Sequence, residues 1–493
     1  MPKNISVLFV SPEVDPLSKT GGLADVSGAL PKALARAGVD VTVATPYYEV
    51  TQAYLAAHGA VPKETGVGVD FWISWRHFQG DVLSTEMPGS NVPVRLIRGS
   101  RFFDRDGLYQ HQGVDYEDNL ERFVFFARAV IESAMAAGKR FDIVHVNDWQ
   151  SALIPVYLKV AYNDKELFAG TKTVLTVHNL AYQGLFPKQE YDIVGLPWNL
   201  FTWDKLEFYD QVNVLKGGLV FADSITTVSP TYAREIQTEE FGCGLEGLLT
   251  CRKKDLVGIL NGVDYSVWSP DADSFIPVKY DKRNRKKKAD NQAALRQECG
   301  LPDTSGPLIG IISRLADQKG FDILSEIIDD ILKMDVQMVV LGTGDPKYHE
   351  LFEGLQSRDP HKVRVFLKFD NRLAHLIEAG SDMFLMPSYY EPCGLNQIYS
   401  LRYGTVPIVR ETGGLKDTIV NATPANIKAG KANGFSFKEH SGKALLATLK
   451  RAVKMFTDEP ETWDALVARG MSEDFSWDAA GKNYVALYEK LVE

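Results

Sequence analysis

Short apolar runs alternate with longer amphipathic stretches along most of the chain. Runs rich in β-branched residues that lie between helical stretches indicate strands of a parallel sheet covered on both faces. One series lies at residues 5–10, 141–146, 173–177 and 224–228, and a second lies at residues 308–312, 338–341, 363–367, 383–386 and 406–409. Because the pattern stops and then begins again, the sequence predicts two α/β domains.

A polar, proline-containing segment separates the two series. It spans residues 269–306 and contains a basic run at residues 282–288. Such a run can act as a localisation signal or an anion-binding patch, but solvated charges in a linker are the simpler interpretation, which we favour. Near the end of the chain, apolar residues recur at roughly helical spacing, which predicts a helix with one buried face. These residues are Ala479, Tyr484, Leu487 and Leu491.

The composition narrows the possible partners. With 493 residues the chain exceeds what one hydrophobic core usually supports, which agrees with two large domains. Its 45% hydrophobic and 24% charged residues are typical of a folded globular protein. The net charge of −10 argues against a nucleic-acid partner, because binding to a phosphate backbone requires an excess of positive charge.

Targeting signals and membrane segments are not evident in the pattern. The first apolar run is short, and Glu13 and Asp15 soon follow it, which argues against a signal peptide. No apolar stretch approaches the length that spans a bilayer. The four cysteines show no Cys-x-x-Cys pair and no spacing with His that indicates zinc. We therefore expect a cytoplasmic protein with reduced thiols and no membrane partner.

Two stretches far apart in the chain have similar sequences. Residues 19–25 read KTGGLAD and residues 411–417 read ETGGLKD, and each lies between a strand-like run and a helical one. Adjacent glycines let the backbone approach a ligand closely, and the helix behind them directs N–H groups at an anion. The repeat therefore predicts two similar domains that bind one phosphorylated ligand between them.

Polar residues directly follow several of the expected strands. Ligands of open α/β sheets bind beyond the carboxyl ends of the strands, so these residues are the first candidates for a site. Taken singly, each has a simpler explanation: a His at a strand end is usually hydrogen-bonded structure, and an Asp there often caps a helix. Their occurrence together favours a ligand site. The candidates are Asp148, His178, Arg314, Lys319 and Glu391.

These residues, with the motifs around them, make the chain resemble the bacterial-type glycogen synthases, a family shared with the plant starch synthases. The resemblance implies a GT-B fold, in which two Rossmann-like domains face each other across a cleft. Placed on this sequence, it implies an N-terminal domain at residues 1–265, a nucleotide-sugar-binding domain at 266–477 and a C-terminal helix at 478–493 that returns to the first domain. The matching stretches run in family order at residues 19–26, 145–150, 176–184, 228–233, 260–264, 313–320, 391–395 and 410–417.

The resemblance also implies a reaction, the transfer of glucose from ADP-glucose to the nonreducing end of an α-1,4-glucan with retention of configuration. UDP-glucose stays an alternative donor, because the phosphate motifs do not read the base. The departing diphosphate concentrates negative charge that fixed cations stabilise. We expect Arg314 and Lys319 to supply that charge, together with Lys19 and the backbone at Gly21 and Gly22.

The remaining roles follow from the same resemblance. Glu391 is expected to hold sugar hydroxyls, while His178 and Asp148 lie on the donor-sugar and acceptor side. Exposed aromatic residues can stack on sugars, although packing is their more common role. The other expected substrate-binding residues are Asp25, Asn261, Cys393, Gly394, Leu395, Thr412 and Gly413, with Tyr116 as the aromatic candidate.

The sequence predicts no metal and no cofactor. Two Asp-x-Asp motifs, at residues 104–106 and 271–273, are of the kind that holds Mg²⁺ or Mn²⁺ in other glycosyltransferases. Neither follows a convincing strand, and the Arg and Lys residues already supply positive charge. Eight residues after Glu391, where some retaining families have a second Glu, this chain has Tyr399. We therefore favour same-face attack over a two-carboxylate mechanism.

Three other functions compete with this interpretation. A Rossmann oxidoreductase requires Gly-x-Gly-x-x-Gly after its first strand, and the nearest candidate, at residues 342–347, lacks the third glycine. A glucan-binding protein without turnover would share the fold, but the residues expected to hold the leaving group are all present. A glucan phosphorylase requires a lysine-bound pyridoxal phosphate, for which no motif is visible.

Overall fold

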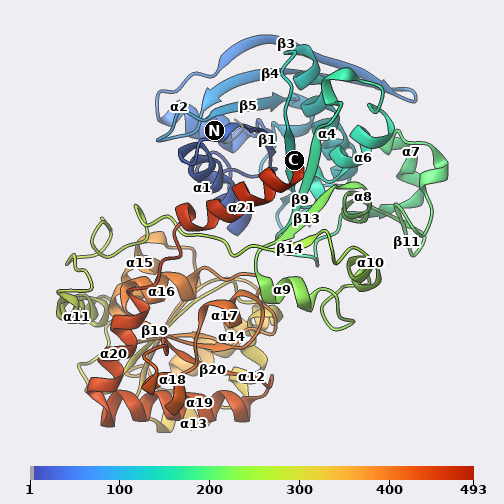
Figure 1. Cartoon of the computed structure of the whole chain (residues 1–493). Coiled ribbons are helices and arrows are strands. Elements are labelled where there is room, and N and C mark those ends of the chain that lie inside the picture. Colours follow the sequence, from blue (N-terminus) through green and yellow to red (C-terminus); the bar gives the residue numbers. More distant parts are fainter. Residues whose placement is uncertain (1–4) are drawn as a thin grey trace. The chain divides into compact units, whose positions relative to one another are not determined.

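The computed structural model describes residues 5–493, which divide into two compact α/β units (Figure 1). The first unit contains the chain up to Val228, together with Ala233–Gly262 and Trp477–Glu493. The second unit contains Ser229–Tyr232 and Val263–Ser476. Each unit has its own largely parallel sheet, which confirms the predicted fold class.

The sheet of the first unit has nine strands in the order β14-β13-β9-β8-β1-β2-β5-β4-β3. The strands from β14 to β5 are parallel, and β4 and β3 extend the sheet as an antiparallel hairpin. The order reverses between β1 and β8, which marks the switch point where ligands of such sheets bind. The strands are β1 (Ser6–Val10), β2 (Asp40–Pro46), β3 (Lys63–Ile73), β4 (Arg76–Glu86), β5 (Pro93–Arg98), β8 (Ile143–Asn147), β9 (Lys172–Val177), β13 (Ser224–Thr227) and β14 (Leu256–Gly258).

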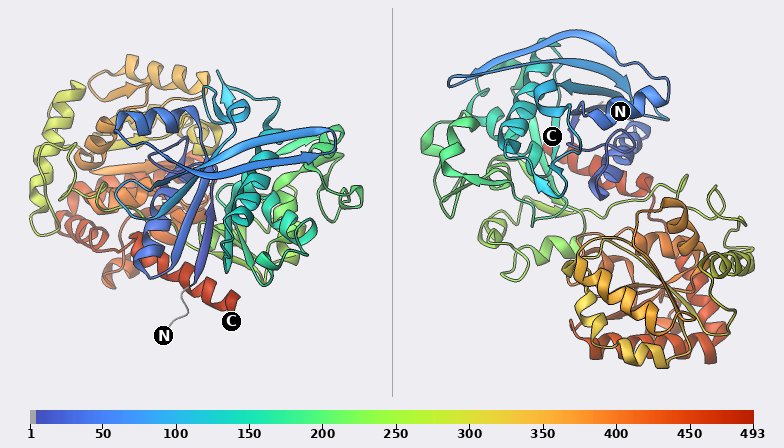
Figure 2. Two further views of the ribbon diagram at one scale, coloured as in Figure 1. Left: turned by 90° about the horizontal axis from the view of Figure 1, so that it is seen from above. Right: turned by 180° about the vertical axis from the view of Figure 1, so that it is seen from behind.

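Helices cover both faces of this sheet. Every residue of β8 is buried, and because successive side chains of a strand point to opposite faces, both faces must be covered. On one face, α1 (Gly22–Arg36) and α21 (Trp477–Val492) pack together and share a core with β1 and β2. The other helical group, α4 (Asn119–Ala136), α6 (Leu153–Val160) and α8 (Val214–Phe221), is visible in both views of Figure 2.

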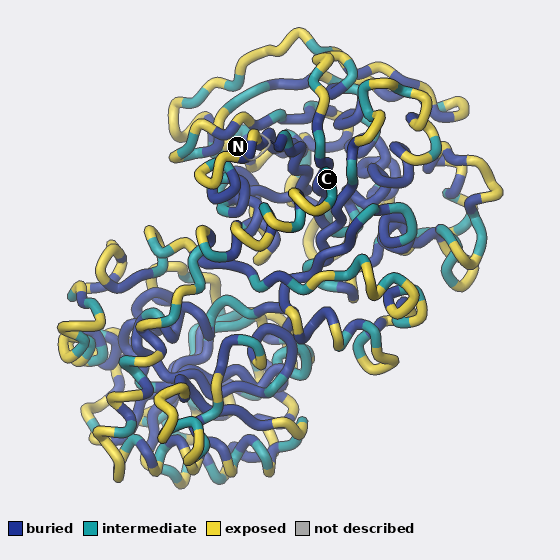
Figure 3. Tube along the Cα trace, in the orientation of Figure 1, coloured by how far each residue is buried: buried dark blue, intermediate teal, exposed yellow. Residues whose placement is uncertain are grey.

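The sheet of the second unit has six parallel strands in the order β17-β16-β15-β18-β19-β20. Counted along the chain this is again the Rossmann order 3-2-1-4-5-6, with the switch point between β15 and β18. Separate apolar clusters lie on its two faces, and Figure 3 shows the buried strands at the centre. The strands are β15 (Leu308–Ile312), β16 (Gln337–Leu341), β17 (Val363–Phe366), β18 (Met383–Met386), β19 (Val406–Arg410) and β20 (Phe435–Phe437).

The C-terminal helix α21 belongs to the first unit. Its buried face is centred on Tyr484 and Tyr488, while Leu487 and Leu491 lie at the margin of the core. The Tyr488 hydroxyl lies 2.6 Å from Nδ1 of His145, which is itself fully buried on β8. His145 is therefore a structural residue that holds the helix against the sheet.

Two residues of the basic run at residues 282–288 contact the fold, while Lys282, Arg283, Lys286 and Lys287 are exposed. Arg285 pairs with Asp464 at 2.5 Å. Lys288 begins α11 (Lys288–Cys299), and its Nζ donates to the carbonyl oxygens of Glu378 and Ala379 at 3.1 and 2.8 Å. These contacts agree with the interpretation as a linker and helix start. None of the described helices has the length and apolar character needed to cross a membrane.

Candidate active site

Most expected site residues follow strands at or near the switch point of each sheet, whereas Asn261 follows β14 and Tyr116 follows the short strand β7 (Val114–Asp115). In the first unit the others lie after β1, β8 and β9, and in the second after β15, β18 and β19. Since the carboxyl ends of parallel strands share one edge, each set gathers at the ligand-binding edge of its own unit.

An ion pair lies at the switch point of the second unit. Nζ of Lys319 lies 2.7 Å from Oε2 of Glu391, and the Ser388 hydroxyl donates to the same oxygen at 3.1 Å. Glu391 is 7% exposed, so its carboxylate is fixed with one face toward Lys319. The exposed Arg314 follows β15 on the same edge. The structure thus brings Lys319 and Glu391 into contact, while Nη2 of Arg314 lies 3.4 Å from Oε1 of Gln318 in the same loop as Lys319.

Gly320 explains how the Lys319 and Glu391 loops come so close. It has a φ of +72°, and a Cβ atom there would lie 2.0 Å from the carbonyl oxygen of Pro387. Neither the left-handed backbone nor that distance tolerates a side chain. The glycine that follows Lys319 therefore allows the lysine to reach the carboxylate.

The loop after Glu391 leads directly into α16 (Asn396–Tyr403). Cys393 is buried, whereas Gly394 and Leu395 are half-buried. The Gln397 side chain donates to the carbonyl oxygens of Cys393 and Gly394, both at 3.0 Å. This fixes the backbone around Gly394, whose φ is +70°. The first N–H groups of α16 are thereby held at the switch point, as an anion site requires.

The glycines of the second Gly-Gly turn allow close packing against a neighbouring loop, whereas the sequence predicted that they allow a ligand to approach. A Cβ atom on Gly413 would lie 1.9 Å from the Glu391 carbonyl oxygen, and one on Gly414 would lie 2.0 Å from the Cys393 carbonyl oxygen. These glycines pack against the backbone of the Glu391 loop, and Thr412 beside them is buried. Their first role is to support that loop; substrate contacts of Thr412 and Gly413 stay a prediction.

The first Gly-Gly turn is open by comparison. A Cβ atom on Gly21 would meet nothing within 4 Å, and Gly22 is exposed. Nζ of Lys19 pairs with Oδ1 of Asp25 at 2.5 Å and lies 3.6 Å from Asp15. Burial works against the charge on Lys19, but the attraction of Asp25 and Asp15 outweighs it and raises the lysine pKa. Lys19 therefore carries its charge throughout the neutral pH range.

Two residues that sequence reasoning missed hold this turn. The Glu13 carboxylate accepts hydrogen bonds from the backbone N–H groups of Thr20 and Gly21 and from the Thr20 hydroxyl. The Tyr109 hydroxyl donates to it at 2.8 Å. The Gly21 N–H, which the sequence assigned to an anion, instead donates to Glu13 at 3.3 Å. The position of Glu13 just after the first strand was the available signal.

Asp148 has an unusual conformation and environment. Its φ is +53°, a left-handed value that Asp adopts more readily than most residues but still at some cost. Oδ1 of Asp148 accepts the backbone N–H of His178 at 2.7 Å. Burial raises the pKa of this carboxyl to about 7. A strained acid that titrates near neutral pH is typical of functional sites.

His178 is a neutral imidazole. Its Nε2 lies 2.9 Å from Oδ1 of Asn147, and burial lowers the pKa of the ring to about 3. The side chain is therefore a hydrogen-bonding group at physiological pH. Close packing fixes the loop that follows, since a Cβ atom on Gly184 would lie 2.5 Å from the Trp149 ring.

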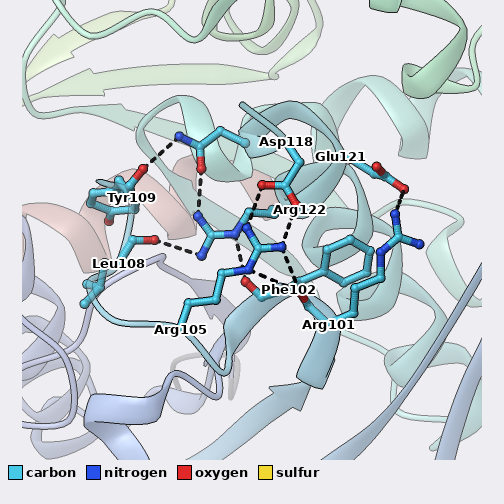
Figure 4. Close-up of polar contacts among 9 residues, drawn as sticks. Arg101, Phe102, Arg105, Leu108, Tyr109, Asp118, Glu121 and Arg122 are labelled. Carbon is cyan, nitrogen blue, oxygen red and sulfur yellow. Dashed lines mark hydrogen bonds and ion pairs between the residues drawn. The ribbon is translucent and has the colours of Figure 1, made fainter. Parts of the chain in front are cut away.

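Asn261 and Tyr116 lie in contrasting surroundings. Oδ1 of Asn261 is buried and has no hydrogen-bond partner among residues 5–493, and its expected contact with substrate stays a prediction. Tyr116 is occupied within its own loop: its hydroxyl donates to the Asp106 carbonyl oxygen, and its ring lies 5.1 and 4.8 Å from the guanidinium groups of Arg105 and Arg122. Figure 4 shows these two arginines and the groups they bind.

The two Asp-x-Asp motifs lie in unlike environments. Asp106 is exposed beside His111, whereas Asp273 is buried and accepts from the Tyr403 hydroxyl at 2.5 Å, with His375 at 2.8 Å. Within the described part of the chain, no group of three or more His, Cys, Asp or Glu side chains could hold a metal ion.

One aromatic residue that the sequence analysis did not select lies at the edge of the second sheet. Phe369 follows β17 and is 87% exposed.

Known protein families match both units. A family described as the starch synthase catalytic domain matches residues 6–251. A second family, described as glycosyl transferases group 1, matches residues 294–464. The two matches correspond to the two sheets.

Individual proteins match over nearly the whole chain. The glycogen synthase of Koribacter versatilis is 49% identical over 98% of both chains, and that of Thermotoga maritima is 44% identical over 99% of both. The catalytic domain of starch synthase IV from Arabidopsis thaliana, solved with ADP and acarbose, superposes with a TM-score of 0.89 at 34% identity, covering 99% of this chain and 100% of that one.

A more distant structure shares the fold alone. Sucrose-phosphate synthase from Thermosynechococcus elongatus has a TM-score of 0.59 at 18% identity, with 99% of each chain covered. Identity above 40% over the whole length, together with the starch synthase structure, decides the family. The chain belongs to the glycogen synthase and starch synthase family and is a glycosyltransferase.

Proposed function

We propose that this glycosyltransferase moves glucose from ADP-glucose to the nonreducing end of an α-1,4-glucan, with retention of configuration and without a metal ion or cofactor. The observation that carries the proposal is the Lys319–Glu391 pair beside Arg314 at the switch point of the second unit. It combines two cations for a diphosphate with a fixed carboxylate for sugar hydroxyls. The excess negative charge of the chain speaks against a nucleic-acid substrate.

The leaving group is the first chemical problem that these residues address. As the bond between the anomeric carbon and the phosphate oxygen breaks, negative charge grows on the diphosphate. Lys319 is already held in place at 2.7 Å from Glu391, so it needs little reorganisation to stabilise that charge. In the first unit, Lys19 and the N–H group of Gly22 are the groups expected to bind phosphate. This set of groups is the reason to expect turnover without a metal.

The sugar and the acceptor are the second problem. Glu391 accepts hydrogen bonds from sugar hydroxyls, and the neutral His178 offers a ring nitrogen and its backbone carbonyl. Asp148, with a pKa of about 7, is suited to accept a proton from an incoming glucan hydroxyl near neutral pH. Because position 399 is a tyrosine, we favour attack on the same face as the departing phosphate.

Binding of the nucleoside is the third chemical problem. Phe369 is exposed at the carboxyl end of β17, on the edge where nucleotides bind in this sheet order. An exposed aromatic ring there can stack on the base. The Arabidopsis starch synthase was solved with ADP, which supports adenine as that base.

The test measures diphosphate release from ADP-glucose and from UDP-glucose, each with and without glycogen, in buffer that contains a chelator. We expect glycogen-dependent release of ADP, and an α-anomeric linkage in the product by NMR. Release from UDP-glucose alone would overturn the donor, and activity that requires added Mg²⁺ or Mn²⁺ would overturn the metal-free mechanism.

A further inference from the structure

We propose that Glu13 is a positioning residue: its carboxylate fixes the Lys19–Gly22 turn for the donor phosphates and connects that turn to the loop that carries Tyr109. The inference rests on the proposed function of this turn. It goes beyond that function because Glu13 itself is not expected to touch the substrate.

All four hydrogen-bonding positions of the Glu13 carboxylate are used. Oε2 accepts from the N–H groups of Thr20 and Gly21 at 2.6 and 3.3 Å. Oε1 accepts from the hydroxyls of Thr20 and Tyr109 at 2.6 and 2.8 Å. The residue is 3% exposed. The partners of Oε2 are N–H groups that can only donate, so an acceptor is required on that side, and the two hydroxyls complete the set at Oε1.

The backbone of Glu13 is fixed as well. The Ser11 hydroxyl donates to the Glu13 carbonyl oxygen at 2.7 Å, and the Glu13 N–H lies 3.3 Å from the same hydroxyl. Ser11 follows β1, and its hydroxyl also accepts from that of Ser27 on α1 at 2.8 Å. The carboxylate is thus anchored to the strand and helix that flank the turn.

Tyr109 is also held through its backbone, and Figure 4 shows this residue together with Arg122. Nδ2 of Asn119 donates to the Tyr109 carbonyl oxygen at 2.9 Å, and Oδ1 of Asn119 accepts from Nη1 of Arg122 at 2.7 Å. Arg122 is fully buried on α4 and donates to the Leu108 carbonyl oxygen at 3.0 Å. A continuous chain of hydrogen bonds therefore runs from α4 through Tyr109 and Glu13 to the Gly-Gly turn.

The charge of Glu13 argues for a role in geometry. A carboxylate beside a diphosphate site repels the ligand, and, after burial, the negative charge of Glu13 also helps to raise the pKa of Asp148. Holding a negative charge there costs binding energy unless it provides something a neutral group cannot. What it provides is an acceptor for three donors of the turn and for the Tyr109 hydroxyl, in a turn that otherwise faces open space at Gly21.

The experiment compares Glu13→Gln with wild type and with Glu121→Gln. Gln keeps the size of Glu13 but replaces one acceptor oxygen with a donor group. Glu121 is a matched control, since it is a buried carboxylate on α4 that pairs with Arg101 at 3.0 Å and has no contact with the turn. Tyr109→Phe removes one of the four donors and keeps the ring.

We expect kcat/KM for ADP-glucose to fall about 10-fold in E13Q and about 3-fold in Y109F, because small misplacements of binding groups are costly in rate. The KM for glycogen should stay within about twofold of wild type, and E121Q should match wild type. Hydrogen–deuterium exchange of a peptide covering residues 17–24 should be faster in E13Q, with an unchanged melting temperature.

Three results would overturn the positioning role: unchanged kcat/KM for E13Q, unchanged exchange in the turn, or an equal loss in E121Q. If wild type releases no diphosphate from either sugar nucleotide, the proposed function fails instead. In that case the exchange measurement alone still decides whether Glu13 holds the turn.

Discussion

The two Gly-Gly turns have nearly the same sequence and do different work. In the first, Gly21 faces open space and the turn is held from behind by Glu13. In the second, Gly413 and Gly414 lie against the backbone of the Glu391 loop, where a Cβ atom would overlap carbonyl oxygens. The first turn is thus open at its glycine, as the proposed phosphate contact requires, whereas the second is closed by a neighbouring loop.

The source of positive charge differs in the same way. The first turn carries its own cation, Lys19, while the second has Glu411 at the matching position. In the second unit the cation comes from the loop after β15, where Lys319 pairs with Glu391. The similar sequences therefore indicate a similar strand-turn-helix geometry. The chemical role of each turn depends on the residues around it.

The largest effect should come from removing Lys319, which supplies the positive charge that the second Gly-Gly turn does not carry itself. We expect Lys319→Ala to lower kcat about 1,000-fold, because one preorganised group that stabilises transition-state charge is worth about this much. The matched control is Lys347→Ala, an exposed lysine that pairs with Asp317, and it should stay within about twofold of wild type. Steady-state ADP release decides between them, and equal losses would refute the assignment.

The acid of the first unit should come next. Asp148→Asn should lower kcat about 100-fold if Asp148 accepts a proton, and wild-type activity should decline as the pH falls below 7. A wild-type profile that is flat from pH 5.5 to 8 would contradict this role.

Asp148 should also make stability depend on pH, in the direction opposite to that of activity. Because the pKa of Asp148 is raised to about 7 from an ordinary value of 3.8, the folded state binds this proton more tightly than the unfolded chain. The resulting stabilisation is present at low pH and is lost as the pH rises through 7. Urea unfolding at pH 5.5 and 8 should therefore show a smaller difference for D148N than for wild type.

The glycines test the comparison directly. Gly413→Ala must accommodate a methyl group 1.9 Å from a carbonyl oxygen at a φ of +43°, and we expect it to destabilise the protein by about 3 kcal/mol. Gly21→Ala should change stability by less than about 0.5 kcal/mol, because its Cβ meets nothing. Chemical denaturation measures both, and similar losses would erase the distinction between the turns.

The smallest effect should concern the base. Phe369→Ala should raise the KM for ADP-glucose about 10-fold with kcat unchanged, since stacking on one base is worth about 1–3 kcal/mol. The exposed Trp203 of the first unit offers a control, and W203A should leave this KM within about twofold of wild type. A changed kcat for F369A would point to a role other than stacking.

Most of the sheet framework was readable from the apolar runs. Runs such as residues 308–312 and 383–386 correspond to β15 and β18, because strands buried on both faces have continuous apolar sequences. The β3–β4 hairpin was not predicted. Its residues alternate between buried ones such as Phe71 and exposed ones such as Trp72, and it contains three glycines that interrupt the pattern.

The candidate site was readable as a set of positions but not as a set of contacts. Lys319 and Glu391 are 72 residues apart, and only the strand order places both at one switch point. Glu13 and Tyr109 are 96 residues apart. The hydrogen bonds that the Glu13 carboxylate accepts produce no repeating pattern in the sequence from which they could be predicted. Local pattern predicts elements, while pairings over such distances depend on the finished topology.

The C-terminal helix has a consequence for how the molecule is made. A chain leaves the ribosome from its N-terminus, and domains usually fold in that order. Here Tyr484 and Tyr488 of α21 complete the core on which β1 and α1 also pack. The unit whose synthesis begins first therefore lacks part of its core until residues 484–488 have been made, so the second unit has all of its residues before the first one does.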